Sequence, residues 1–147
     1  MYSAKRKEVN FEELLKNFSA ENGGNGKDLR ISAHLTSDFV FVSGPKDDLL
    51  QFKAYCKTKR VASHVVNDAY GFHHPILEGA AQEFRKAVEA VHFGDPEVPV
   101  LSNFTGNKID KNEAKDVLVR QIYNPILLLE CIQNALRADC NVFIDVG

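Results

Sequence analysis

The chain has few cysteines, and their spacing does not suit structural cross-links. Cys56, Cys131 and Cys140 are odd in number, and no two of them form a C-x-x-C pair. A disulfide framework needs paired thiols and a structural zinc site needs clustered ligands, so the sequence argues against both. We expect no metal ion, and we expect an intracellular, reducing location, either a cytoplasm or, in a eukaryote, a mitochondrial matrix.

Other absences exclude further classes of protein. No apolar run is long enough to span a bilayer, and the first residues lack the apolar stretch of a secretory signal. A net charge of −2 argues against a nucleic-acid-binding surface. The glycine-rich loop at residues 22–27 is not a P-loop, because Glu21 and Asp28 stand where glycine and a hydroxyl residue are required. We therefore expect neither a nucleic-acid partner nor a membrane partner.

The most informative feature that is present is Gly71-Phe72-His73-His74-Pro75. Pro75 suits the first position of a helix, which places His73 just before a helix N-terminus. Histidine exchanges protons near neutral pH, and the positive end of a helix dipole disfavours its charged form. A neutral imidazole is the form that a general base needs, so His73 is a candidate for acid–base chemistry.

Residues 10–66 follow the pattern of a helix, two strands, a second helix and a third strand. Asn10 and Glu13 read as a capping box for the first helix. Apolar and polar residues indicate strands over 29–35, 39–42 and 61–66, the second of them more fully buried. Pro45 is expected at the first position of a helix that runs to about Lys57. This order makes up most of a ferredoxin-like split βαβ unit that lacks its first strand.

The pattern after His73 alternates helices with strands. Helical spacing predicts an amphipathic helix over 76–91. We then expect a strand over 98–103, a turn over 105–107, and a helix that Asp110 caps with Glu113 at its third position. A further helix over 126–136, opened by Asn124 and Pro125, leads to a buried strand over 142–146. This alternation predicts a parallel α/β sheet.

Several of these stretches together resemble the acyltransferase family that loads malonyl groups onto acyl carrier protein. The resemblance covers roughly residues 29–147, and the stretches occur in the family's order. They are Phe41-Val42-Ser43-Gly44, Gly71-Phe72-His73-His74-Pro75-Ile76-Leu77, Val98-Pro99-Val100-Leu101-Ser102-Asn103 with Thr105-Gly106, Leu118 to Pro125 (similar to the L-x-x-Q-x-x-x-P signature), and Phe143-Ile144-Asp145-Val146-Gly147. Any one stretch is a weak signal, but their order and spacing make the resemblance specific.

The resemblance implies a ping-pong acyl transfer. In this family a serine in a G-H-S-x-G elbow attacks malonyl-coenzyme A, a histidine takes its proton, and the phosphopantetheine thiol of acyl carrier protein then removes the malonyl group. Carried over, His73 is the general base, and the segment of Gln121 lies against the active site, where we expect a carbonyl to hold the His73 N–H. Phe72 resembles the residue that malonyl-selective members have directly before the histidine, where a bulky ring would crowd a 2-methyl substituent on the acyl group. No cofactor is implied besides the coenzyme A thioester and the phosphopantetheine.

The sequence also departs from the family's pattern. It contains no G-x-S-x-G, and His74 stands where a small residue, often serine, is usual. We expect the nucleophile, the oxyanion-hole glutamine and the carboxylate-binding arginine upstream of residue 1, and the chain to be cut at both ends. The fold expected is a partial α/β-hydrolase-like acyltransferase core over 68–147 with a truncated ferredoxin-like small subdomain over 1–67. Alone, such a chain should be inactive, and the missing N-terminal half is a candidate partner.

Three alternatives stay open. The chain could be part of the acyltransferase domain of a fatty-acid or polyketide synthase, a non-catalytic remnant that binds carrier protein or another partner, or part of an α/β-hydrolase-like esterase. The other histidines, His34, His64, His74 and His92, are expected to be structural or surface residues. Asn103 and Asn124 suit turn and cap positions as well as active-site positions.

Overall fold

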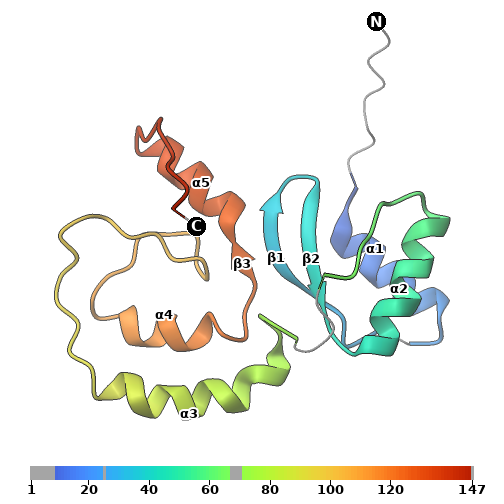
Figure 1. Ribbon diagram of the computed structural model, residues 1–147, viewed down its shortest axis with the longest axis horizontal. Helices are drawn as coiled ribbons and strands as arrows, with labels where there is room; N and C mark the ends of the chain where they lie inside the picture. The colour runs from blue at the N-terminus through green and yellow to red at the C-terminus, as the bar shows by residue number, and fades with distance from the viewer. Residues whose placement is uncertain (1–8, 25, 67–70, 147) are drawn as a thin grey trace, which may run out of the picture.

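The computed structural model describes residues 9–24, 26–66 and 71–146, which form a mixed α/β structure. The α/β fold class that the sequence predicts is confirmed. Figure 1 shows α1 and α2 at one end of the molecule, α3, α4 and α5 at the other, and β1, β2 and β3 between them. The elements are α1 (Phe11–Glu21), β1 (Arg30–Thr36), β2 (Phe39–Ser43), α2 (Lys46–Thr58), the 3₁₀ turn η1 (Pro75–Leu77), α3 (Glu78–Glu89), α4 (Ala114–Arg120), β3 (Ile126–Leu127) and α5 (Leu128–Arg137).

A small mixed sheet connects the two ends of the molecule. Its strand order is β2-β1-β3. β1 pairs antiparallel with β2, whereas it pairs parallel with β3 through Ala33 opposite Ile126 and His34 opposite Leu127. The parallel pairing joins residues that lie far apart in the sequence, and it brings the C-terminal part of the chain against β1 (Figure 1).

The N-terminal end of the molecule has an aromatic core. The Phe18 ring on α1 meets the Phe52 ring on α2 edge to face, with ring centroids 5.3 Å apart. Buried Leu29 and Cys56 complete this cluster, together with Tyr55. Aromatic residues contribute large apolar areas, so this cluster is what holds α1 and α2 together.

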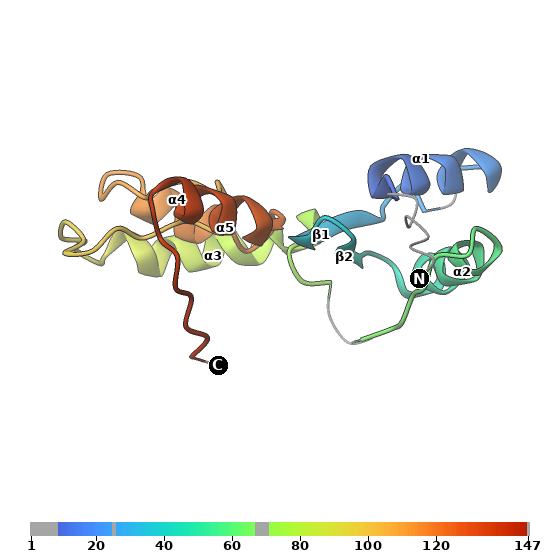
Figure 2. The same ribbon diagram turned by 90° about the horizontal axis from the view of Figure 1, so that it is seen from above.

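The other end of the molecule has a separate core. Ala81 and Val88 on α3 pack with Val119 on α4, and Ala81 and Val119 are completely buried. Figure 2 shows α3, α4 and α5 together at this end of the molecule. The two cores fall within residues 1–67 and 68–147, and the boundary between these two units stays a prediction.

Three expected strands are absent from the described residues. Residues 61–66 and 142–146 have no regular secondary structure, and within 98–103 only Leu101 pairs, in an isolated bridge with Lys108. These segments are apolar, as strands should be, but a strand also needs a hydrogen-bonded neighbour. The segment expected to be buried at 142–146 is instead exposed; Ile144, for example, has 81% of its surface accessible. β2 is likewise less buried than expected, because its Phe39 is exposed.

Several helix boundaries also differ from expectation. Asp110 accepts a hydrogen bond from the Asn112 backbone in the turn before α4, so it caps that turn and not the helix. Asn124 donates to the Arg120 carbonyl at the end of α4, and the segment after Pro125 opens as β3, because it pairs with β1. Pro45 precedes α2 as its N-cap. The helix expected from residue 76 begins as the 3₁₀ turn η1.

Other local predictions are confirmed. The Asn10 side chain accepts a hydrogen bond from the Glu13 backbone N–H at 3.0 Å and so caps α1. The strands expected at 29–35 and 39–42 are β1 and β2, shifted by at most one residue at each end. Gly106 has a φ of +71° in the turn over 105–107, a conformation that glycine adopts without strain.

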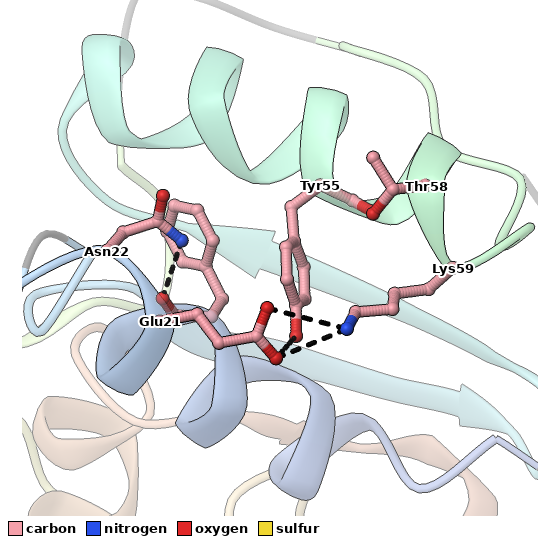
Figure 3. A network of polar contacts seen from close by, with 6 residues as sticks. Glu21, Asn22, Tyr55, Thr58 and Lys59 are labelled. Atoms are coloured by element: carbon pink, nitrogen blue, oxygen red, sulfur yellow. Dashed lines mark hydrogen bonds and ion pairs between the residues drawn. The ribbon is translucent and has the colours of Figure 1, made fainter.

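A polar network joins the ends of α1 and α2 beside Tyr55 (Figure 3). The Tyr55 hydroxyl donates to the Glu21 carboxylate at 2.9 Å, and the Lys59 ammonium lies 3.1 Å from the same carboxylate. The hydrogen bond from Tyr55, followed by the hydrogen bond from Lys59, lowers the pKa of Glu21 below its usual value. A carboxyl whose pKa is lower in the folded protein stabilises the fold only while it is ionised.

Replacement of Tyr55 by phenylalanine should test this network. The Tyr55→Phe variant keeps the ring in the core but loses one hydrogen bond, so its free energy of unfolding should fall by about 0.5–1.5 kcal/mol at pH 7. The difference should shrink as the pH falls through and below the ordinary range of a glutamate, because the protonated Glu21 is a weaker acceptor. Urea unfolding at several pH values measures it. A difference that is independent of pH would contradict the role given to Glu21.

Candidate active site

The Gly71–Pro75 motif forms a turn that leads into η1 and α3. His73 has a φ of +52°, which is uncommon outside glycine, and His74 returns to an extended conformation. The turn thus changes direction at His73 before the helix begins. A residue held in the left-handed region at such a junction is a frequent feature of functional sites.

The His73 ring contacts the end of α4. Its Nδ1 lies 2.8 Å from the backbone oxygen of Gln121. A carbonyl can only accept, so Nδ1 must carry a proton, and in the neutral ring Nε2 then keeps its lone pair. Gln121 follows the last residue of α4, where carbonyl groups have no partner within the helix, and this leaves its oxygen available. His73 is therefore held in the tautomer that a general base acting through Nε2 requires.

Two ion pairs fix the helices on which this contact depends. The Arg85 guanidinium on α3 donates to the Asp116 carboxylate on α4 at 2.8 Å, and it lowers the pKa of Asp116. Lys115 on α4 lies 3.6 Å from the Glu89 carboxylate on α3, and it also donates to the Glu89 backbone oxygen at 2.7 Å. Together with the apolar contacts of Val119, these pairs set the position of η1 and α3 relative to the end of α4, and hence of His73 relative to Gln121.

The remaining residues of the motif lie differently. Phe72 is 53% exposed, directly before His73. His74 is buried, its Nε2 lies 2.6 Å from the Asp28 backbone oxygen, and its Nδ1 accepts from the Ile76 backbone N–H. Sequence reasoning does not single out Asp28 or the Arg85–Asp116 pair. Asp28 acts through its backbone oxygen, which has no signal in the sequence. The Arg85–Asp116 pair is one of many charge pairs that the sequence allows.

The other reactive groups do not join His73. Within residues 9–24, 26–66 and 71–146, no serine, threonine or cysteine is hydrogen-bonded to its ring. Burial raises the pKa of the Cys56 and Cys131 thiols, which makes them poor nucleophiles. His64 and His92 are exposed. The same described ranges contain no cluster of three or more residues suited to a metal ion. Nor does any helix in them have the length and apolar character needed to cross a membrane.

Curated proteins with similar sequences are polyketide synthases and transacylases. The chain is 30% identical over 112 residues to a non-reducing polyketide synthase of Menisporopsis theobromae, which is 72% of this chain and 5% of the synthase. It is 29% identical over 77 residues to the malonyl CoA-acyl carrier protein transacylase of Bacillus subtilis, which is 52% of this chain and 24% of the transacylase. No protein-family model matches the sequence. The chain thus corresponds to only part of each relative.

Solved structures show the same likeness. The malonyl transacylase of Streptococcus pneumoniae matches with a TM-score of 0.81 and 19% identity, over 97% of this chain and 46% of the other. The enzyme from Burkholderia pseudomallei matches with a TM-score of 0.78 and 23% identity, over 92% and 48%. This chain therefore has the fold of part of an acyltransferase. The resemblance to malonyl-CoA:acyl carrier protein transacylases and to the acyltransferase domains of polyketide synthases is confirmed.

The contact between His73 and Gln121 makes a simple prediction. Because the backbone of Gln121 supplies the acceptor, Gln121→Ala should leave His73 in its Nδ1–H tautomer. Long-range ¹H–¹⁵N NMR spectra of the imidazole report the tautomer directly, and a Gln121→Glu variant provides a control of similar size. A mixture of tautomers in Gln121→Ala would show that the side chain, and not the carbonyl, orients His73.

Proposed function

We propose that this chain carries the histidine base of an acyltransferase that moves a malonyl group from coenzyme A to acyl carrier protein. The observation that carries the proposal is the His73 ring, whose Nδ1 is held by the Gln121 carbonyl and whose Nε2 is left as a base. Histidine oriented in this way by an acceptor on its far nitrogen is the arrangement that activates a serine nucleophile.

The reaction we propose proceeds in two balanced steps. His73 Nε2 takes the proton of a serine hydroxyl as the serine oxygen attacks the malonyl thioester. The C–S bond then breaks, and coenzyme A leaves as a thiol after it receives that proton. In the second step the phosphopantetheine thiol gives its proton to His73 and attacks the malonyl-serine ester, and the serine oxygen recovers the proton. The Gln121 carbonyl stabilises the imidazolium in both steps. The substrates are the thioester malonyl-coenzyme A and the phosphopantetheine thiol, the product is the malonyl thioester of the carrier protein, and no cofactor takes part.

The similar proteins support the choice of substrates and partners. Transacylases for malonyl-coenzyme A and acyl carrier protein are among them in sequence and in structure. One matching structure, with a TM-score of 0.78 and 19% identity, is a malonyl-transacylase in complex with a polyketide acyl carrier protein. We therefore propose malonyl-coenzyme A and acyl carrier protein as the partners of this site. We place the reaction inside the cell, in cytoplasm or mitochondrial matrix, where the three free cysteines stay reduced.

We further propose that the nucleophile comes from outside this sequence. The 147 residues contain no G-x-S-x-G. The apolar segment at 142–146, together with exposed Val98 and Val100, has the composition of strands without the neighbours that strands need. An apolar face of this kind suits the remainder of the acyltransferase fold, the part of the matched transacylases that this chain does not cover. By itself the chain should transfer nothing.

A domain of a polyketide synthase is the second candidate. The match to the Menisporopsis theobromae synthase extends over 112 residues, compared with 77 residues for the Bacillus subtilis transacylase. The two candidates share the chemistry of His73 but differ in what surrounds it in the gene. Sequencing the full transcript distinguishes them, since a synthase continues into other catalytic domains.

A chimera tests the proposed base. Residues 9–146 would replace their structural equivalents in the Streptococcus pneumoniae transacylase, whose remainder should supply the nucleophile. We expect transfer of malonyl from coenzyme A to acyl carrier protein, measured by the intact mass of the carrier. His73→Gln should lower kcat about 10²–10⁴-fold, the usual contribution of a general base.

Two controls make this result decisive. His92→Gln changes an exposed histidine beyond the end of α3 and should leave the rate unchanged. The isolated 147-residue chain, incubated with malonyl-coenzyme A, should gain no malonyl mass. Equal rates for the wild-type and His73→Gln chimeras would refute the base. A folded chimera without any transfer would favour a non-catalytic remnant.

Phe72 is proposed to restrict the acyl group. Its exposed ring lies directly before the proposed base, and we propose that it crowds a 2-methyl substituent on the substrate. In the chimera, Phe72→Ala should reduce the preference for malonyl over methylmalonyl by about 10-fold or more, as expected for one methyl group in a pocket. The ratio of kcat/KM values for the two thioesters measures this preference, and Phe72→Leu provides an intermediate size. An unchanged ratio would remove Phe72 from substrate selection.

A further inference from the structure

His74 is one of few buried polar side chains in the described part of the molecule, at 8% exposure. Both of its ring nitrogens are hydrogen-bonded. Nδ1 accepts from the Ile76 backbone N–H at 3.1 Å, and Nε2 lies 2.6 Å from the Asp28 backbone oxygen. A donor at one nitrogen and an acceptor at the other fix a neutral ring with its proton on Nε2.

The two adjacent histidines are therefore held in opposite tautomers by opposite parts of the molecule. His73 donates from Nδ1 to the Gln121 carbonyl at the end of α4. His74 donates from Nε2 to the Asp28 carbonyl in the turn before β1. The short segment is thus attached through His73 to the end of α4 and through His74 to the turn before β1.

The Asp28 anchor is itself well fixed. The Gly26 backbone N–H donates to the Asp48 carboxylate at the start of α2, at 3.2 Å, and the Leu29 N–H donates to the Gly26 carbonyl. Leu29 is buried in the aromatic core. The carbonyl that accepts the His74 hydrogen bond therefore belongs to a turn that is held by both α2 and the aromatic core.

The backbone between these two anchors is strained. His73 has a φ of +52°, and a left-handed conformation in a residue other than glycine persists only when its surroundings hold it. His74 provides that restraint on the C-terminal side of His73. Its Nδ1 accepts from the Ile76 N–H and so caps η1, and its Nε2 is hydrogen-bonded to the Asp28 carbonyl.

We propose that His74 is a positioning residue for His73. Its two hydrogen bonds hold the left-handed backbone at His73, and this backbone points the His73 ring at the Gln121 carbonyl. The catalytic consequence rests on the proposed function, but the positioning itself does not. Three substitutions separate the two bonds. His74→Phe removes both, His74→Asn keeps an acceptor for the Ile76 N–H, and His74→Gln keeps a donor that reaches toward Asp28.

Imidazole NMR of the 147-residue chain tests the positioning without any enzyme assay. In the wild-type protein, long-range ¹H–¹⁵N spectra should show a single Nδ1–H tautomer for His73 and a single Nε2–H tautomer for His74. In His74→Phe, the His73 signals should move to values averaged between tautomers. His74→Gln and His74→Asn should each restore part of the Nδ1–H population, and His92→Phe should change nothing.

The outcomes separate positioning from mere stability and from the proposed reaction. An unchanged His73 tautomer in a folded His74→Phe protein would overturn the proposal. If His74→Phe does not fold, an unchanged His73 tautomer in His74→Asn or His74→Gln would overturn the proposal. In the chimera, His74→Phe should lower kcat about tenfold or more with little change in KM. An inactive wild-type chimera would count against the proposed function alone, because the NMR result stands apart from it.

Discussion

The hydrogen bond from the His73 ring to the Gln121 carbonyl is the contact on which the site depends. It joins the turn before α3 to the end of α4, and it leaves Nε2 as the basic nitrogen. The α3–α4 packing, with Val119 at its centre and the Arg85–Asp116 pair at its surface, keeps the two partners at this distance. The residues of the second core thus support the proposed base by holding its acceptor in place.

His74 makes a corresponding hydrogen bond to the other end of the molecule. Its ring reaches the Asp28 carbonyl in the turn before β1, so the segment that carries the proposed base is hydrogen-bonded to both ends of the molecule. The parallel pairing of β1 with β3 is a second connection between the two ends, and it involves residues just after Gln121. The sheet and the two histidines together place the candidate site where the two ends of the molecule meet.

The fold follows the sequence closely where structure is local. The Asn10 cap, β1, β2 and the turn at Gly106 depend on neighbouring residues, and their patterns predict them correctly. Segments 61–66 and 142–146 have the composition of strands but no strand partner among the described residues, so their patterns mislead. The helix predicted from residue 126 begins only at Leu128, because Ile126 and Leu127 pair with β1 as a strand.

The sequence by itself determined which residues could do chemistry. The sequence alone contains the Gly71–Pro75 motif and the ordered stretches that resemble the family, and it shows that no G-x-S-x-G is present. Only the tertiary structure decided how these residues act. The resemblance predicts an acceptor in the Gln121 segment, and the structure shows the Gln121 backbone oxygen at His73 Nδ1. The acceptor of His74, the Asp28 backbone oxygen, has no signal in the sequence, because every residue possesses such an oxygen. The opposite tautomers of His73 and His74 depend on these oxygens, since a ring nitrogen's role is set by the partner that the fold brings to it.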